Sequence, residues 1–308
     1  MIRTVLGDID RSRLGMTLAH EHFIIDLDRI RKDGISRIDT PEEVIPEIRL
    51  MMEDGIQSAF EVSTIDLGRD VEKLRTISQA TGLQIVASTG YYLSPFHPAK
   101  LETQTPEEIA RTYEKELLEG IGNTGIRAGL IAEIASSPEA FVGHEKKILE
   151  AAGIASRRTG AAVSTHTGRL TAHETIQILL DQGMDPDKII LGHQDLIDDH
   201  EYHLSLLERG VNIAFDTCGK SAYMPDETRA KNALSLIREG YGDHLVLSND
   251  VSRRTYFTSA GGPGYVAVMR VVVPLLRKYG ATEEELRKLL ADNPGRIVDN
   301  DWRQNPCS

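Results

Sequence analysis

The sequence has few of the features that mark several large classes of protein. Its two cysteines, Cys218 and Cys307, form neither a C-x-x-C pair nor zinc-finger spacing. We therefore expect free thiols, without a disulfide framework or a structural zinc. No apolar run approaches the length of a membrane span, and the charged first residues lack the apolar core of a secretion signal. A soluble cytoplasmic protein without a membrane partner is the expectation.

Positive charge and aromatic side chains are also scarce. The chain has 35 lysines and arginines against 47 aspartates and glutamates, with a formal net charge of −12 and no basic run. This balance argues against nucleic acid and leaves a small molecule as the expected partner. Aromatic residues make up 5% of the chain, which argues mildly against a pocket built for bulky neutral organophosphates.

Short apolar runs alternate with longer amphipathic stretches from residue 17 to residue 291. The runs are rich in Val, Ile, Leu and Ala, a composition typical of strands buried on both faces. They lie at 17–26, 58–64, 84–92, 128–136, 161–167, 189–195, 211–217 and 244–250. Helices are expected between them, as at 40–55, 70–82, 105–120 and 145–160, several with a Thr or Asp cap and a final Gly. Eight such units predict a (β/α)8 TIM barrel.

No linker rich in proline, glycine or serine divides the chain, so we expect one domain over residues 1–308. Residues 1–16 precede the first strand and are compatible with a short hairpin or with a plug under the barrel floor. Residues 299–308 are polar, contain Trp302 and are expected to form a loose tail.

Metal-binding residue types stand at the ends of the apolar runs. The carboxyl ends of barrel strands open into one mouth, so residues far apart in sequence converge there. His20 and His22 are two positions apart, and the period of a strand sends both imidazoles to the same side. A buried carboxylate is costly unless it is paired or bound to metal. The candidate ligands are His20, His22, Glu133, His166, His193 and Asp250.

One histidine or aspartate at a strand end is more often a hydrogen-bonded structural group than a ligand. Six together favour a catalytic centre with two divalent ions. Two such ions can share a water and lower its pKa towards neutrality, which gives a bridging hydroxide nucleophile. Four imidazoles and two carboxylates suit zinc, which is our default, and also manganese, cobalt or iron.

These residues lie in segments that resemble the phosphotriesterase family of the amidohydrolase superfamily. The resemblance begins at residues 15–22 (GMTLAHEH) and continues at 63–70, 89–92, 124–135, 164–167, 192–195 and 248–250, in the family's order. It implies that His20, His22 and Asp250 hold a more buried ion. A more exposed ion then belongs to His166 and His193, and an acidic group from the fourth strand bridges the pair.

The bridging residue separates branches of this family. Its best-known members use a lysine converted to a carbamate, but residues 128–136 contain no lysine and offer Glu133 one position later. The chain therefore resembles the glutamate-bridged branch, whose members are called phosphotriesterase homology proteins. Efficient organophosphate hydrolysis does not follow from that resemblance.

The leading interpretation is a binuclear hydrolase that cleaves a lactone, carboxylic ester or amide. Asp250 is then both a ligand and the general base. Tyr92 corresponds to a tyrosine that holds the substrate oxygen in the lactonase branch, with simple packing at the barrel mouth as the alternative. Lys220, Arg253 and Arg254 follow the last two strands, where barrels often bind phosphate. They suggest an anionic substrate with Arg253 as its main contact, unless all three are ordinary solvated charges.

Other functions remain open at this point. A phosphotriesterase is the nearest alternative. A one-metal isomerase or lyase would have no use for the bridging Glu133, and a metal-dependent binding protein without turnover would have no use for Asp250 as a base. A homodimer is expected from the resemblance.

Overall fold

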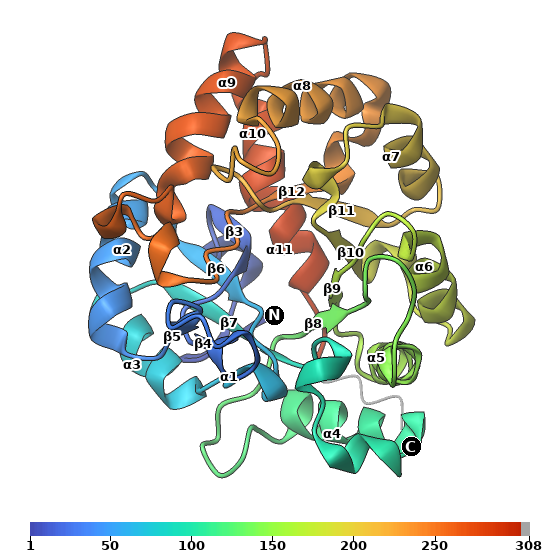
Figure 1. The fold of residues 1–308 in the computed structure, drawn as a ribbon. Helices are drawn as coiled ribbons and strands as arrows, with labels where there is room; N and C mark the ends of the chain where they lie inside the picture. Colours follow the sequence, from blue (N-terminus) through green and yellow to red (C-terminus); the bar gives the residue numbers. More distant parts are fainter. Residues whose placement is uncertain (303–308) are drawn as a thin grey trace.

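Eight parallel strands form a barrel at the centre of the computed structural model, which describes residues 1–302. Their order follows the chain, and Figure 1 shows the main helices as a ring outside them. The strands are β3 (Thr17–Glu21), β6 (Ser58–Glu61), β7 (Gln84–Thr89), β8 (Leu130–Ala135), β9 (Val163–His166), β10 (Ile189–Gly192), β11 (Asn212–Phe215) and β12 (Leu245–Leu247). The predicted (β/α)8 barrel is confirmed.

The helices begin where their sequence caps predict. The four expected helices are α2 (Pro41–Glu53), α3 (Val71–Thr81), α4 (Pro106–Leu118) and α5 (Glu145–Thr159). Asp70 accepts the amides of Glu72 and Lys73 at the start of α3, and Thr105 forms a capping box with Glu108 at α4. The others include α6 (Ala172–Asp181), α7 (His200–Leu207), α8 (Asp226–Leu236), α9 (Val273–Lys278), α10 (Glu283–Arg287) and α11 (Asn293–Val298). No helix among the described residues is long and apolar enough to cross a membrane.

The first strand is shorter than predicted. It ends at Glu21 rather than at residue 26, because Ile25 and Asp26 form β4 (Ile25–Asp26), which pairs antiparallel with β5 (Arg37–Ile38). The short helix α1 (Asp28–Arg31) lies between β4 and β5. The apolar FIID segment is therefore part of an insertion after the first strand.

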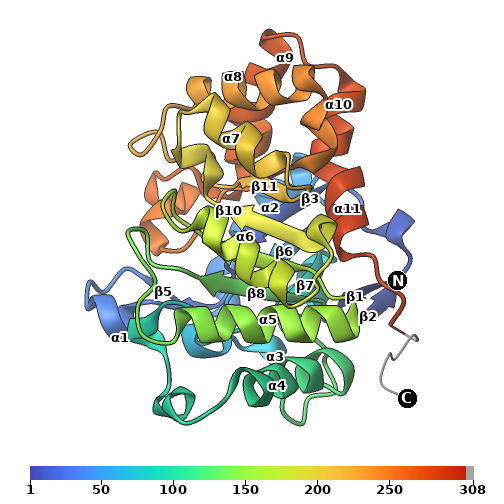
Figure 2. The same cartoon turned by 90° about the vertical axis from the view of Figure 1, so that its right-hand side faces the viewer.

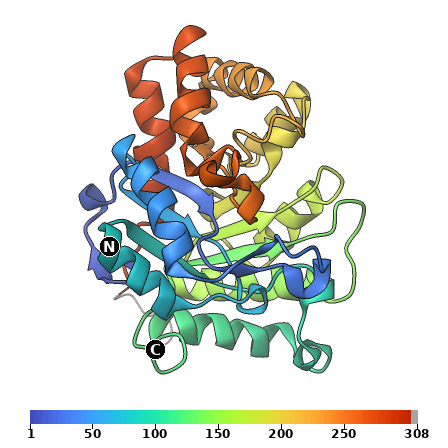
Figure 3. The same cartoon turned by 60° about the vertical axis from the view of Figure 1, so that its left-hand side comes forward.

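The N-terminal segment and the last helix close one end of the barrel. β1 (Ile2–Thr4) and β2 (Gly7–Ile9) form an antiparallel hairpin, so the hairpin expectation holds. Ile2, Ile9 and Leu14 belong to the same buried cluster as Ile297 and the inward side chains of the strands, so this segment also plugs the floor. Figures 2 and 3 show the N-terminus at this end, and Figure 2 labels the hairpin there with α1 and β5 at the opposite end.

The start of the predicted tail is packed rather than loose. The amino group of Met1 lies 2.5 Å from Asp299 Oδ1, and Trp302 Nε1 donates to the Met1 carbonyl at 3.0 Å. The guanidinium of Arg3 lies 3.9 Å from the centre of the Trp302 ring. Residues 303–308, including Cys307, lie outside the described residues, and Cys218 is free and buried.

The seam between the first and last strands is joined differently from the rest of the barrel. Within residues 1–302, no backbone ladder links β3 to β12. The hydroxyl of Ser248 instead accepts from His20 N at 3.0 Å and donates to His20 O at 2.7 Å, and Asp250 N donates to the same carbonyl at 3.3 Å. The Ser248 side chain and one backbone hydrogen bond therefore connect the two strands at this seam.

Candidate metal centre

The six predicted ligands converge at the carboxyl ends of the strands. His20 lies in β3 and Glu133 in β8, and His166 is the last residue of β9. His22, His193 and Asp250 follow β3, β10 and β12 within three residues. The insertion carrying α1 and β5 extends beyond this end of the barrel, away from the floor (Figure 2). The candidate site is therefore at the mouth, as predicted.

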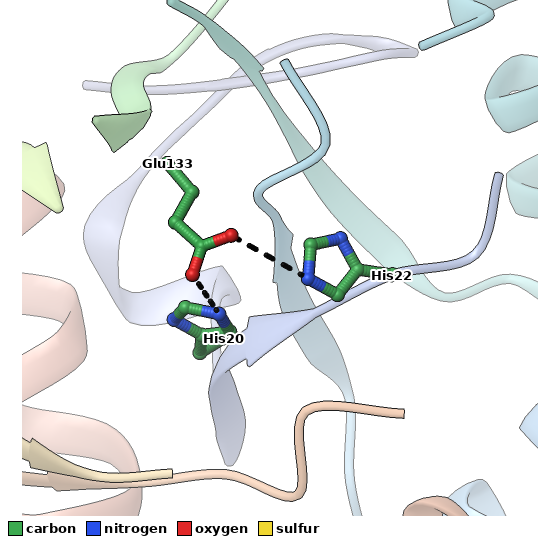
Figure 4. Close-up of side chains that lie close together, drawn as sticks. All are labelled: His20, His22 and Glu133. Carbon is green, nitrogen blue, oxygen red and sulfur yellow. Dashed lines mark ion pairs between the residues drawn. The ribbon is translucent and has the colours of Figure 1, made fainter. Parts of the chain in front are cut away.

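Glu133 is the centre of the cluster. Its Oε1 lies 3.3 Å from His20 Nε2, 3.0 Å from His166 Nδ1 and 3.2 Å from His193 Nε2. Its Oε2 lies 3.8 Å from His22 Nε2, so the two oxygens face different imidazoles, as Figure 4 shows for His20 and His22. One carboxylate between four imidazoles is the arrangement expected of a bridge between two ions.

A local irregularity of β8 accompanies this position. The register between β8 and β9 shifts between Ile131 and Ile134, on either side of Glu133. Such bulges re-aim a side chain and are common next to active sites. The buried carboxylate, 2% exposed, thus faces the barrel mouth in a strand that is otherwise apolar.

Asp216, which was not among the predicted site residues, follows β11 and is fully buried. Its Oδ2 lies 3.2 Å from His20 Nδ1, and its Oδ1 lies 2.8 Å from His193 Nδ1 and accepts His193 N at 2.9 Å. A carboxylate on Nδ1 orients a histidine so that Nε2 is free for metal. The signal was available, since Asp216 directly follows the apolar residues of the predicted strand 211–217.

Burial and charge show that this cluster favours a cation. Burial alone would lower the pKa of His20, but Asp216 and Glu133 outweigh it and raise that pKa to about 10. Burial raises the pKa of Glu133, but the nearby His20 and His166 bring it well below its usual value. Neither ring nitrogen of His20 has a hydrogen-bond partner among the described residues, although Asp216 Oδ2 lies 3.2 Å from Nδ1 and Glu133 Oε1 lies 3.3 Å from Nε2. A cation between these groups would satisfy them.

Three groups of donor atoms within the described residues lie close enough to share an ion, with all atoms of a group within 4.8 Å of one another. They are His20 with His22 and Glu133, Glu133 with His166 and His193, and His20 with His193 and Asp216. Two of the three contain Glu133. Imidazole and carboxylate donors suit zinc and other divalent ions, so the donor set fits a divalent metal site.

Asp250 lies beside these groups rather than within them. Its Oδ1 is 3.4 Å from His22 Nε2, and its Oδ2 accepts a hydrogen bond from Lys220 Nζ. Burial raises the pKa of Asp250, but Lys220, His22 and other nearby charges carry it below its usual range. Asp250 is therefore an ionised carboxylate at the edge of the candidate metal site.

A cavity of about 160 Å³ opens above the cluster. Its wall combines apolar, aromatic and basic side chains, including Ile25, Leu27, Leu67, Leu196, Tyr92, Tyr223, Tyr256, Arg31, Lys220 and Arg253. The hydroxyl of Tyr92 lies 3.4 Å from His166 Nδ1. Burial and then the charges of Glu133 and Asp250 raise the pKa of Tyr92 well above its usual value. Tyr92 is therefore a neutral hydroxyl beside the candidate ligands.

The basic residues that follow the last two strands are not equivalent. Lys220 and Arg253 line the cavity, and both lie over the ring of Tyr256, at 4.8 and 5.2 Å from its centre. Arg254 does not line it, since its Nε lies 2.6 Å from Glu43 Oε2. The expectation that Arg254 could contact substrate is therefore not supported. Arg31, on the insertion after β3, lines the cavity and was missed.

Known proteins share the fold and much of the sequence of this chain. A match to the phosphotriesterase family covers residues 1–298. The phosphotriesterase homology protein of Escherichia coli (strain K12) is 33% identical over 284 residues, which span 92% of this chain and 97% of that protein. A solved structure of the E. coli protein, complexed with phosphate in its active site, aligns with a TM-score of 0.91 at 32% identity, covering 94% of this chain and 100% of that one.

Two further relatives carry hydrolase names. An N-acetyltaurine hydrolase of Dictyostelium discoideum is 33% identical over 270 residues, which span 83% of this chain and 73% of that protein. The structure of the lactonase Lmo2620 from Listeria monocytogenes aligns with a TM-score of 0.91 at 26% identity, covering 97% of this chain and 99% of that one. The chain therefore belongs to the phosphotriesterase family, in which it is a metal-dependent hydrolase.

Proposed function

We propose that this protein is a binuclear hydrolase that cleaves the ester, lactone or amide bond of a small anionic substrate. The observation that carries the proposal is the position of Glu133 between four imidazoles. Divalent ions bound there, with zinc as the default, supply Lewis acidity and acidify a water. One ion would be held by His20, His22, Asp250 and Glu133, and the other by His166, His193 and Glu133.

The surrounding residues supply the rest of the chemistry. Asp250, kept ionised by Lys220, takes the proton of the attacking water and passes it to the leaving group. Tyr92 keeps its proton because its pKa is raised, so it donates a hydrogen bond to an oxygen of the substrate. Asp216 holds His20 and His193 with Nε2 towards Glu133.

The cavity wall supports an anionic substrate. The Arg253 Nε is buried and has no hydrogen-bond partner among the described residues. The E. coli relative has phosphate in its active site, and the D. discoideum relative is named for N-acetyltaurine, an amide with an anionic sulfonate. Both observations agree with an anionic substrate, for which Arg253 is the candidate contact.

The reaction type is tested directly by a hydrolysis screen. Purified protein with its metals counted would be offered lactones, carboxylic esters, amides and phosphotriesters, each with and without a remote anionic group. We expect turnover of an anionic lactone, ester or amide by protein with about two ions per chain. Turnover of phosphotriesters alone, or full activity with one ion, would contradict the proposal. A homodimer and a cytoplasmic location stay predictions.

Arg253→Ala is expected to raise KM for an anionic substrate with little change in kcat. A contact that persists from the ground state to the transition state changes binding rather than turnover. A hydrogen bond to a charged group contributes about 1.5 to 3 kcal/mol, so kcat/KM should fall by roughly tenfold to a hundredfold. Steady-state kinetics with a charged substrate and its uncharged analogue measures the effect.

Arg254→Ala is the matched control, because Arg254 is the next residue but pairs with Glu43 outside the cavity. Its KM should equal that of the wild type. Equal losses for charged and uncharged substrates in Arg253→Ala would show that Arg253 does not hold the anion.

Asp216→Asn is expected to weaken metal binding by about tenfold to a hundredfold, as the loss of a carboxylate behind a histidine ligand does. An asparagine is neutral and has only one side-chain oxygen. It therefore cannot present a negatively charged oxygen to both His20 Nδ1 and His193 Nδ1. Competition with a chelator of known affinity measures the change. Unaltered affinity would mean that the two histidines are oriented without Asp216.

A further inference from the structure

Glu21 is the last residue of β3 and lies between His20 and His22, but its carboxylate accepts hydrogen bonds from the segment that contains Asp250. Glu21 Oε1 accepts from Asn249 N at 2.8 Å and from Asn249 Nδ2 at 2.9 Å. Glu21 Oε2 accepts from Val251 N at 3.1 Å. The side chain is fully buried. One carboxylate therefore binds the backbone amides on both sides of Asp250.

The backbone at Asp250 needs such support. Its φ is 49°, in the left-handed region that residues other than glycine seldom adopt. A residue persists in this region only where the surrounding structure holds it there. The amides that flank Asp250 both point at Glu21, so the carboxylate fixes the turn that directs the Asp250 side chain towards His22.

The same buried hydrogen-bond network also contacts the backbone carbonyls of His20 and His22. Ser248 lies within hydrogen-bond distance of Glu21 Oε1, at 2.8 Å, and of His20 O, at 2.7 Å. Tyr265 donates its hydroxyl to His22 O at 2.7 Å, and its carbonyl accepts from Asn249 Nδ2 at 3.1 Å. Polar side chains thus take the place of a ladder between β3 and β12.

We infer that Glu21 is a positioning residue that fixes the place of Asp250 relative to the candidate metal ligands His20 and His22. The inference rests on the proposed role of Asp250 as ligand and base. Successive side chains of a strand point to opposite sides. His20 and His22 therefore face the barrel mouth, and Glu21, which lies between them, faces the seam with β12. Geometry at the centre therefore depends on a side chain that touches neither substrate nor metal.

Glu21→Gln tests the inference, because the NH₂ group of the glutamine must face the N–H of Asn249 or of Val251. Two donors then face each other, and one hydrogen bond beside Asp250 is lost. We expect kcat to fall by on the order of tenfold to a hundredfold, as small misplacements of catalytic groups do, with KM nearly unchanged. We also expect a chelator to strip metal faster from Glu21→Gln than from the wild type. This second measurement needs no substrate, so it remains informative if the proposed reaction is wrong.

Glu145→Gln is the matched control. Glu145 is also fully buried and accepts several amides, including those of Ser137 and Val142 at 2.9 Å, but it flanks no candidate ligand. Both Glu145→Gln and Glu21→Gln should lower the unfolding temperature. In Glu145→Gln, however, kcat and the rate at which a chelator removes metal should stay at wild-type values. Equal losses of kcat in both variants would show that Glu21 only stabilises the fold and does not position Asp250.

A folded Glu21→Gln with wild-type kcat and chelation rate would overturn the inference. If Glu21→Gln does not fold, Glu21→Asp decides, because it keeps the charge but is one carbon too short to reach Asn249 and Val251 together. A loss of kcat and faster chelation in Glu21→Asp support the positioning role, and wild-type values refute it.

Discussion

Asp250→Asn will lower kcat by on the order of a hundredfold or more, the contribution of a general base, while most of the metal stays bound. The amide oxygen can still face His22, but asparagine cannot take a proton from the attacking water. Lys220, which is 6% exposed and donates to Asp250, would then lie buried beside a neutral group. The unfolding temperature is therefore also expected to fall.

Kinetics, metal analysis and thermal unfolding of the same preparation separate these effects. Lys220→Met provides the comparison, since it removes the cation and keeps the carboxylate. If Asp250→Asn retains nearly full kcat with its metal, Asp250 is only a ligand. If it loses metal in proportion to activity, its role as a base is unsupported.

Glu133→Ala should have the second large effect. Four imidazoles lose the one carboxylate they share, so we expect less than one ion per chain and a loss of activity beyond about a hundredfold, the upper range for changes behind a ligand. Elemental analysis after dialysis measures the metal. Glu145→Gln serves again as a buried-carboxylate control and should keep its metal.

The wild type gives the complementary result. Removing the metal with a chelator should abolish activity, and adding metal back should restore it without bicarbonate, because a glutamate is a carboxylate as synthesised. A modified lysine at the centre, two tightly held ions in Glu133→Ala, or a requirement for bicarbonate would contradict a glutamate bridge.

The barrel and the convergence of its histidines could be predicted because both depend on local pattern. An apolar run that ends in a polar residue places that residue at the mouth wherever the strand sits in the barrel. His20, His22, His166 and His193 follow this rule, whereas Glu133 lies inside β8 and could be predicted as a costly buried carboxylate in an apolar strand. Their family segments gave the same prediction independently.

What was missed depends on neighbours that the sequence does not reveal. Asp216 acts on His193 from the adjacent strand and on His20 from two strands away, past β12, so its role appears only once the strands are arranged. Arg31 reaches the cavity because β4 leaves the barrel to pair with β5, although its apolar sequence suits a continued strand. Arg253 and Arg254 differ because extended backbone at Arg253 turns successive side chains in opposite directions.

The joined chain ends have a practical meaning. Met1 and Asp299 form an ion pair at the barrel floor, and Figure 2 shows the N-terminus at the end of the molecule opposite α1 and β5. Replacing residues 303–308 with a short peptide that joins residue 302 to Met1 would make a circular chain. Opening that chain at an exposed loop would create new termini. A loop at the mouth could in this way be freed at one end without cutting any strand that carries a ligand.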